Sequence, residues 1–228
     1  MSSIRGVARP DASEVAILTQ EAARNLIESF RPPSALATGC VLDHIDEHMR
    51  RFIALAPLCF VSSCDAAGVQ EVSPRGDPPG SFRILSKRRL AIADRPGNNR
   101  VDTLRNLLVN SQLGLIFVIP GVDETLRMSG RGHVSVDDGL LRSMSIDGRM
   151  SPRLAIVVDV DRAHLHCAKA FRRSRAWEPD SYASRDELPS FTTMIADQVK
   201  LSADKRAEFE ARIATANVEG LWEGKTPV

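Results

Sequence analysis

Between residues 58 and 168 the chain is a series of short, β-rich apolar runs separated by tight turns, and this pattern constrains the fold more than any other feature. The runs are 58–64, 69–73, 82–86, 90–93, 113–119, 124–136, 154–160 and 164–168. Helical patterns do not alternate regularly with them, which disfavours a parallel α/β sheet. Six or more short antiparallel strands favour a closed or split β-barrel, because closure removes exposed strand edges. The sequence therefore predicts a mainly β (β+α) fold with peripheral helices.

Helical patterns lie at both ends of the chain and once between strands. They cover 11–30, where Asp11 could cap, then 43–55 and 99–109, and finally 190–216 as two helices. We expect a single domain overall, with an N-terminal helical extension at 1–42, the barrel at 43–182, and a C-terminal helical segment at 183–228 packed on the barrel.

Charge and composition exclude several classes of protein. With 30 Lys+Arg against 29 Asp+Glu, the net charge of +1 is too small for a generally basic nucleic-acid binder. The longest apolar stretch, 113–120, is too short to cross a bilayer. The beginning of the sequence has no signal-peptide pattern. The four cysteines lack CxxC spacing, so we expect no metal site or disulfide, and a cytoplasmic location.

Arginine greatly outnumbers lysine, with 25 Arg against 5 Lys. The planar arginine fork suits phosphate better than the point charge of lysine does, so the bias is compatible with phosphate recognition. Codon bias in a GC-rich genome explains the same numbers. Composition alone favours codon bias over phosphate recognition.

The segment 93–107, ADRPGNNRVDTLRNL, is the strongest candidate for an anion site. It leads from a strand through a turn after Asp94 to Asn98, Asn99 and Arg100 at the start of a helix. Free backbone N–H groups at a helix N-terminus, together with amide and guanidinium donors, suit a phosphate. The alternative is that Asn98 or Asn99 only caps the helix, while Arg100 lies on its exposed face.

Two further segments carry suitable chemistry. The first is VSPRGDPPG at 72–80, where the chain leaves a predicted strand. Its candidate residues are Ser73, Arg75, Gly76 and Asp77, and the segment is interpreted either as the rim of a ligand site or as a plain surface loop. The second, at 166–177, combines cations with an aromatic ring and suits an electron-rich ring system, its phosphate, or RNA. Its candidate residues are Lys169, Arg172, Arg173, Ser174, Arg175 and Trp177.

Other chemistry has little support in the sequence. His164 and His166 share one face of a predicted strand, and with Cys167 they lack further metal ligands, so we interpret them as structural. Motifs of hydrolases, NTPases and dinucleotide-binding proteins are missing. Any difficult chemistry is therefore left to a cofactor.

Three motifs carry a resemblance to a known family. They are S-P-R-G-D at 73–77, P-G-N-N-R-x-D-x-x-R-N at 96–106 and H-C-x-K-A-x-x-R-S-x-x-W at 166–177. In this order they resemble a bacterial branch of the pyridoxamine 5′-phosphate oxidase-related, FMN-binding split-barrel family. The likeness covers about 43–182 and is supported by LRMSGRGHV at 126–134.

The resemblance implies a homodimer with FMN in a groove between two split β-barrels. Its phosphate would be held by Arg75, Asn98, Asn99 and Arg100, with Ser73, Gly76, Asp77 and Asp94 beside them. Lys169, Arg173, Ser174 and Trp177 would approach the flavin, from the partner subunit. The chain lacks the R-x-x-L-L-K strand and the R-L-x-P ending of true pyridoxamine phosphate oxidases, so vitamin B6 oxidation is not implied.

Three functions remain open from the sequence. The first is an FMN-dependent oxidoreductase acting on an unidentified small molecule. The second is a non-catalytic flavin-binding or sensor protein, which would have the same site. The third and weakest is an RNA-binding module that uses Lys87–Arg89 and Arg172–Arg175. No catalytic side chain is indicated, because flavin chemistry needs no diagnostic residue.

Overall fold

The computed structural model describes residues 15–146 and 151–219, and the chain divides into two compact units, Met1–Gly39 and Cys40–Val228. In the first unit, α1 spans Gln20–Glu28 and α2 spans Ala35–Gly39. The Thr19 hydroxyl caps α1 by accepting from the Ala22 N–H. The predicted helix at 11–30 is therefore too long within the described residues, and its predicted cap, Asp11, lies outside them.

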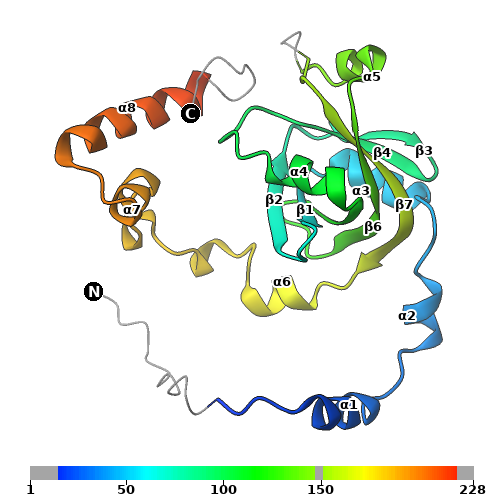
Figure 1. The fold of residues 1–228 in the computed structure, drawn as a ribbon. Coiled ribbons are helices and arrows are strands. Elements are labelled where there is room, and N and C mark those ends of the chain that lie inside the picture. The colour runs from blue at the N-terminus through cyan, green and yellow to red at the C-terminus, as the bar shows by residue number, and fades with distance from the viewer. Residues whose placement is uncertain (1–14, 147–150, 220–228) are drawn as a thin grey trace. The chain divides into compact units, whose positions relative to one another are not determined.

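The second unit is built on one antiparallel sheet with the strand order β2-β1-β5-β6-β7-β4-β3. Figure 1 shows its strands gathered together. The strands are β1 (Leu58–Cys64), β2 (Gln70–Gly76), β3 (Arg83–Ser86), β4 (Arg89–Ala93), β5 (Gln112–Val118), β6 (Thr125–Ser135) and β7 (Ala155–His166). The predicted split-barrel fold of the β+α class is confirmed. The edge strands are β2 and β3.

The prediction of two strands at 154–160 and 164–168 is wrong, because β7 runs unbroken from Ala155 to His166. The polar Asp161 interrupts the apolar pattern without ending the strand. In the ladder with β6, Ser129 pairs with Arg162 and Gly130 pairs with Val160, so Asp161 is the extra residue of a β-bulge. A bulge shifts the alternation of side chains between the two faces of the strand. In the sequence, this shift looks like the end of one strand and the start of another.

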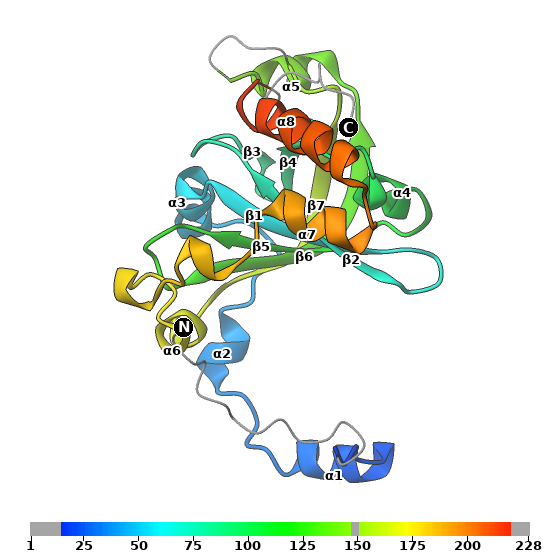
Figure 2. The ribbon, with the colours of Figure 1, turned by 90° about the vertical axis from the view of Figure 1, so that its left-hand side faces the viewer.

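The helices of the second unit are α3 (Glu47–Leu55), α4 (Asp102–Val109), α5 (Asp138–Ser143), α6 (Lys169–Ser174), α7 (Phe191–Gln198) and α8 (Ala203–Glu219). Two short 3₁₀ helices, Pro179–Ser181 and Arg185–Glu187, follow α6. Figures 1 and 2 show α3 and α4 on opposite sides of the strands. That the segment after residue 182 packs on the barrel stays a prediction. Within the described residues, no helix is long and apolar enough to cross a membrane.

Two helices begin later than the sequence predicts. The helix expected at 43–55 starts at Glu47, because the Asp46 carboxylate caps it by accepting from the Met49 N–H at 2.8 Å. Asp43 instead contacts the His44 ring at Nδ1 and forms an ion pair with Arg88. The helix expected at 99–109 starts at Asp102, which leaves the preceding residues in an irregular segment.

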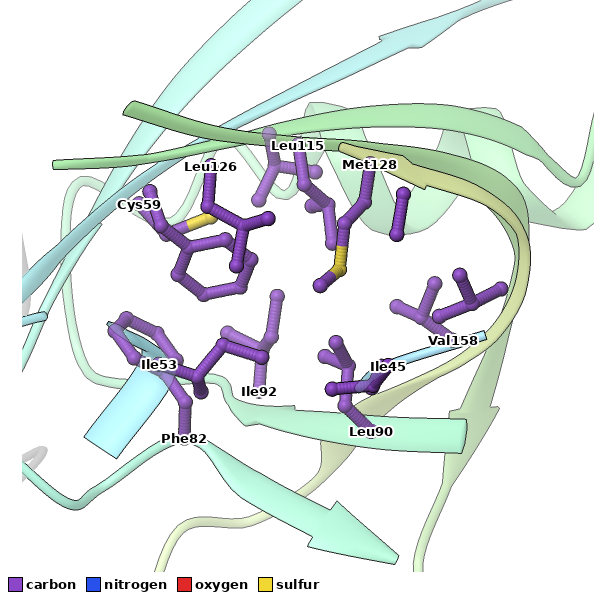
Figure 3. Packing of buried hydrophobic residues seen from close by; sticks show 14 of the residues in the cluster. Ile45, Ile53, Cys59, Phe82, Leu90, Ile92, Leu115, Leu126, Met128 and Val158 are labelled. Carbon is purple, nitrogen blue, oxygen red and sulfur yellow. The ribbon is translucent and has the colours of Figure 1, made fainter. Parts of the chain in front are cut away.

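The hydrophobic core fills the space enclosed by the curled sheet. Figure 3 shows side chains of β1, β5 and β6 facing those of β4 and Phe82, with Ile53 of α3 beside them. Members of this cluster with almost no solvent exposure include Ile53, Cys59, Val61, Leu90, Leu115, Phe117, Leu126, Ile156 and Val158. Burial of this apolar surface is the main source of stability for the barrel.

A buried hydrogen bond fixes α4 against the barrel. The Asn106 side chain donates from Nδ2 to the Ser63 hydroxyl of β1 at 3.0 Å, and both residues are buried. An unpaired amide in this position would be costly, so the bond fixes how α4 lies on β1. The N-terminus of α4 is therefore held in a defined place beside β2.

Gly130 provides a test of the β6–β7 pairing. A Cβ atom at this position would overlap the backbone carbonyl of Asp159, which cannot move without breaking the ladder. We expect Gly130→Ala to lower the free energy of unfolding by about 3 kcal/mol or more. Gly97→Ala is the control, because a Cβ there meets no atom within 4 Å. Urea denaturation of both variants measures the effect, and equal losses of stability would contradict this account of the bulge.

Candidate functional site

A cleft of about 1030 Å³ opens between the end of β2, the segment after β4 and the first turn of α4, with 151–154 completing its wall. It brings together every candidate residue of the first two sequence segments. These are Ser73, Arg75, Gly76, Asp77, Asp94, Asn98, Asn99 and Arg100. The segments are far apart in the sheet order, so the curling of the sheet is what makes them neighbours.

Two ion pairs cross between the walls of the cleft. Arg75 at the end of β2 contacts Asp94 just after β4, with 2.6 Å between Nη1 and Oδ1. Arg95 lies one residue further on, and its Nε is 3.0 Å from both carboxylate oxygens of Asp77. Each wall therefore contributes one arginine and one aspartate.

Arg75 retains one unused donor. Its Nε is buried and has no hydrogen-bond partner, while Nη1 is bound to Asp94. Buried N–H groups are nearly always satisfied in folded proteins, so this guanidinium N–H, on a residue that lines the cleft, is a candidate donor to a ligand. Arg83 Nε and His164 Nδ1 are also buried without a partner, but their residues do not line the cleft.

The residues before α4 have an unusual backbone. Asn99 and Val101 both have positive φ, 56° and 52°, and valine rarely adopts this conformation because its side chain is branched at Cβ. Val101 occupies the N-cap position and supplies no side-chain cap. The alternative in which Asn98 or Asn99 caps the helix is therefore wrong. Asn98 instead accepts from the Arg100 N–H at 3.1 Å through Oδ1.

Arg100 lies at the exposed rim of the cleft. Its side chain is 68% exposed and its Nε is 2.6 Å from Asp102 Oδ2. This pairing raises the pKa of Arg100, first through the hydrogen bond to Asp102 and then through its charge. Arg100 thus remains a permanent cation that keeps donors available to solvent or to a ligand.

The cleft has as many arginines as carboxylates in its lining. Burial raises the pKa of Asp77, and the charge and hydrogen bonds of Arg95 partly offset the rise. Among the described residues, Arg153 of the lining forms no ion pair with a carboxylate. Sequence reasoning missed Arg95 and Arg153. No periodic signal could have found them, because each is placed by contacts between distant segments.

The residues of the third segment lie on or just after α6 and are not part of the cleft lining. The Trp177 indole donates to the Val122 carbonyl at 3.0 Å, and its ring stacks on Phe171 with 5.3 Å between centroids. Ser174 bonds back to the Phe171 carbonyl. Lys169 and Arg173 are exposed. Within one chain, the structure does not bring this group to the first two segments.

His164 and His166 lie together on β7, with 6.4 Å between their ring centroids. The Nδ1 atom of His164 is buried without a partner. Burial lowers the pKa of His164, and the positive charges of Arg127, His166 and Arg162 lower it further. No three His, Cys, Asp or Glu side chains of the described residues are grouped to hold a metal ion.

Comparison with known proteins identifies the family. The model of the pyridoxamine 5′-phosphate oxidase family matches residues 45–167, more than half of the chain, and the chain belongs to this family. Members of the family commonly bind a flavin. The matched region contains the cleft and the whole seven-stranded sheet.

Individual relatives are distant. A pyridoxamine 5′-phosphate oxidase family protein of Aspergillus flavus, ustO, is 26% identical over 132 residues, which cover 55% of this chain and 53% of that protein. The chain thus matches about half the length of this curated relative. HupZ of Group A Streptococcus is 20% identical over 52% of this chain and 91% of that one, with a TM-score of 0.43. A putative pyridoxamine 5′-phosphate oxidase of Lactobacillus delbrueckii is 15% identical over 55% of this chain and 96% of that one, with a TM-score of 0.42.

The pKa of His164 leads to a prediction for acid stability. Because the folded pKa lies below the ordinary value of 6.5, the unfolded chain binds the proton more tightly. The stabilisation is fully present above pH 6.5 and is lost as the pH falls toward the folded pKa. We expect His164→Gln to have a flatter stability curve than the wild type in urea denaturation between about pH 8 and pH 5. Parallel curves would show that His164 does not titrate differently in the two states.

Proposed function

We propose that the protein is a flavoprotein that binds FMN in the cleft and acts as an oxidoreductase on a small molecule, as a homodimer. The observation that carries the proposal is the buried, unpartnered Nε of Arg75 in a cleft that gathers the predicted phosphate-binding residues. Membership of a family whose members commonly bind a flavin supports it. We also propose that the protein belongs to the bacterial branch of the family that its three sequence motifs resemble.

The residues of the cleft fit the phosphate end of FMN. A phosphate dianion needs several converging donors, and guanidinium and backbone N–H groups are the strongest of these. Arg75 offers its buried Nε, Asn98 and Asn99 lie on the segment before α4, and Arg100 stands at the rim. The first turn of α4 also lines the cleft, and its N–H groups lack partners within the helix.

Asp77 and Asp94 have a different role from the donors, although sequence analysis grouped them together. A carboxylate would repel a phosphate, and each already binds an arginine of the opposite wall. In this proposal they orient Arg95 and Arg75. Ser73 and Gly76 form the adjoining part of the wall, where β2 ends.

Bound FMN would supply the redox chemistry, and the side chains need not provide a nucleophile. The task of this chain is then to bind the cofactor, to orient it and to limit the access of water. Lys169, Arg173 and Trp177 lie outside the lining of the cleft in the same chain. We assign them to the flavin site of the partner subunit in the homodimer, where exposed cations would favour the reduced, anionic form of the cofactor.

The absorption spectrum is the primary test. Protein purified as expressed, or mixed with FMN and dialysed, is expected to be yellow, because bound flavin absorbs visible light. Dithionite is expected to bleach it, and NADH or NADPH tests the oxidoreductase part of the proposal. A colourless protein that takes up no added FMN would rule out the flavin site. Bleaching by dithionite without any turnover in a substrate screen would leave a flavin-binding protein that is not an enzyme.

Substitution of Arg75 tests where the phosphate binds. We expect Arg75→Gln to weaken FMN binding by about 1.5–3 kcal/mol, the range for a hydrogen bond to a charged group, as measured by fluorescence titration. Arg100→Ala should cost about 1 kcal/mol, because this arginine is exposed and paired with Asp102. Arg50→Gln, an exposed arginine of α3 outside the cleft lining, is the control. Unchanged FMN affinity in Arg75→Gln would mean that the phosphate binds elsewhere.

A further inference from the structure

The two ion pairs of the cleft cross the split of the barrel. The sheet ends at β2 on one side and at β3, next to β4, on the other, and no backbone ladder joins these edges. Arg75 and Asp77 belong to the end of β2, and Asp94 and Arg95 directly follow β4. Side chains therefore make the connection that strand pairing makes elsewhere in the sheet.

The pair of Asp77 and Arg95 is the more buried of the two. The Asp77 side chain is 6% exposed and that of Arg95 13%, against 23% for Asp94 and 16% for Arg75. In such surroundings two matched charges attract strongly, and removal of one leaves the other unpaired and poorly solvated. Both oxygens of Asp77 share the single N–H of Arg95 Nε, at 3.0 Å each.

Arg95 also binds a third segment. Its Nη2 donates to the Met144 carbonyl at 2.8 Å, directly after α5. The backbone N–H of Asp77 donates to the Pro57 carbonyl at 3.0 Å, which ties its wall to the start of β1. Arg95 and Asp77 thus join the two walls, in addition to the pair of Arg75 and Asp94, through groups that are themselves held by the barrel.

We propose that Asp77 and Arg95 are positioning residues that set the distance between the two walls, so that donors of both walls reach one phosphate. This inference deepens the proposed function and rests on it. Arg75 stands on the β2 wall, while Asn98, Asn99 and Arg100 stand on the other wall. A phosphate contacts both groups only at one separation. Neither Asp77 nor Arg95 need touch the cofactor.

A positioning role and a merely structural role predict different effects on the preference for FMN over riboflavin. FMN and riboflavin share the isoalloxazine ring and the ribityl chain, and only FMN has the phosphate. Loss of the correct wall separation weakens the phosphate contacts alone, so it lowers the preference for FMN over riboflavin. General loosening of the barrel weakens both ligands alike.

The test compares FMN and riboflavin affinities of the full-length protein by fluorescence titration. We expect Asp77→Asn and Arg95→Gln each to lower the ratio of FMN to riboflavin affinity by about tenfold, a typical coupling between contacting side chains. The double variant should lose little more than Arg95→Gln alone, because both lose the contact between Asp77 and Arg95 and the contact of Arg95 with the Met144 carbonyl. Arg95→Lys keeps the charge but cannot contact Asp77 and the Met144 carbonyl together. It should therefore still lower the ratio of FMN to riboflavin affinity.

The matched control is Arg89→Gln. It breaks a 2.6 Å ion pair between Arg89 and Asp159, which links β4 and β7 where a backbone ladder already joins them. Its affinity ratio should equal that of the wild type. An unchanged ratio in the folded Asp77→Asn and Arg95→Lys variants overturns the positioning role while the wild type still binds FMN. A wild type that binds no FMN overturns the proposed function and this inference together.

Discussion

The ion pair between Asp77 and Arg95 is the more buried of the two ion pairs that join the walls of the cleft. The hydrophobic core can hold the strands in a curled sheet, but it does not determine how far apart the unpaired edges stand. Apolar burial is non-directional, whereas an arginine held by a carboxylate at Nε and by a carbonyl at Nη2 has a narrow range of orientations. The split of the barrel therefore has a defined width because charged side chains span it, and a site that uses both of its walls gains a fixed shape from the same contacts.

A crossed arrangement of two pairs also solves an electrostatic problem. The lining has equal numbers of arginines and carboxylates, so the cleft carries no large net charge that would repel its own walls. An incoming phosphate must then be recognised by donors that the carboxylates have not used. Arg75 Nε and the N–H groups at the start of α4 are such donors, and Arg153 adds a cation that has no carboxylate partner among the described residues. In the proposed site, selectivity for an anion would follow from geometry rather than from overall charge.

The sequence predicted the strands and the candidate residues of the cleft, because alternation, turn residues and family motifs are local signals. It could not predict that β7 continues through Asp161, since a bulge is decided by the pairing with β6. It also placed Asn98 or Asn99 as a possible cap, whereas Val101 takes the N-cap position with positive φ. The ion pair between Asp77 and Arg95 joins residues 18 positions apart, and nothing in either segment alone indicates the partner. Tertiary contacts, absent from any local pattern, decided each of these features.

The excess of arginine over lysine, ambiguous as composition, has a physical explanation in the cleft. Arg75 binds Asp94 through Nη1 and keeps Nε for another acceptor, and Arg95 binds Asp77 through Nε while Nη2 reaches Met144. Each guanidinium can donate to two acceptors in different directions, because its five N–H donors are fixed in one plane. A lysine ammonium has its donors on one atom and would bind one carboxylate without holding the second contact in a set direction. In the proposed phosphate site, an arginine at each of these two positions makes both contacts at once, which a lysine could not do.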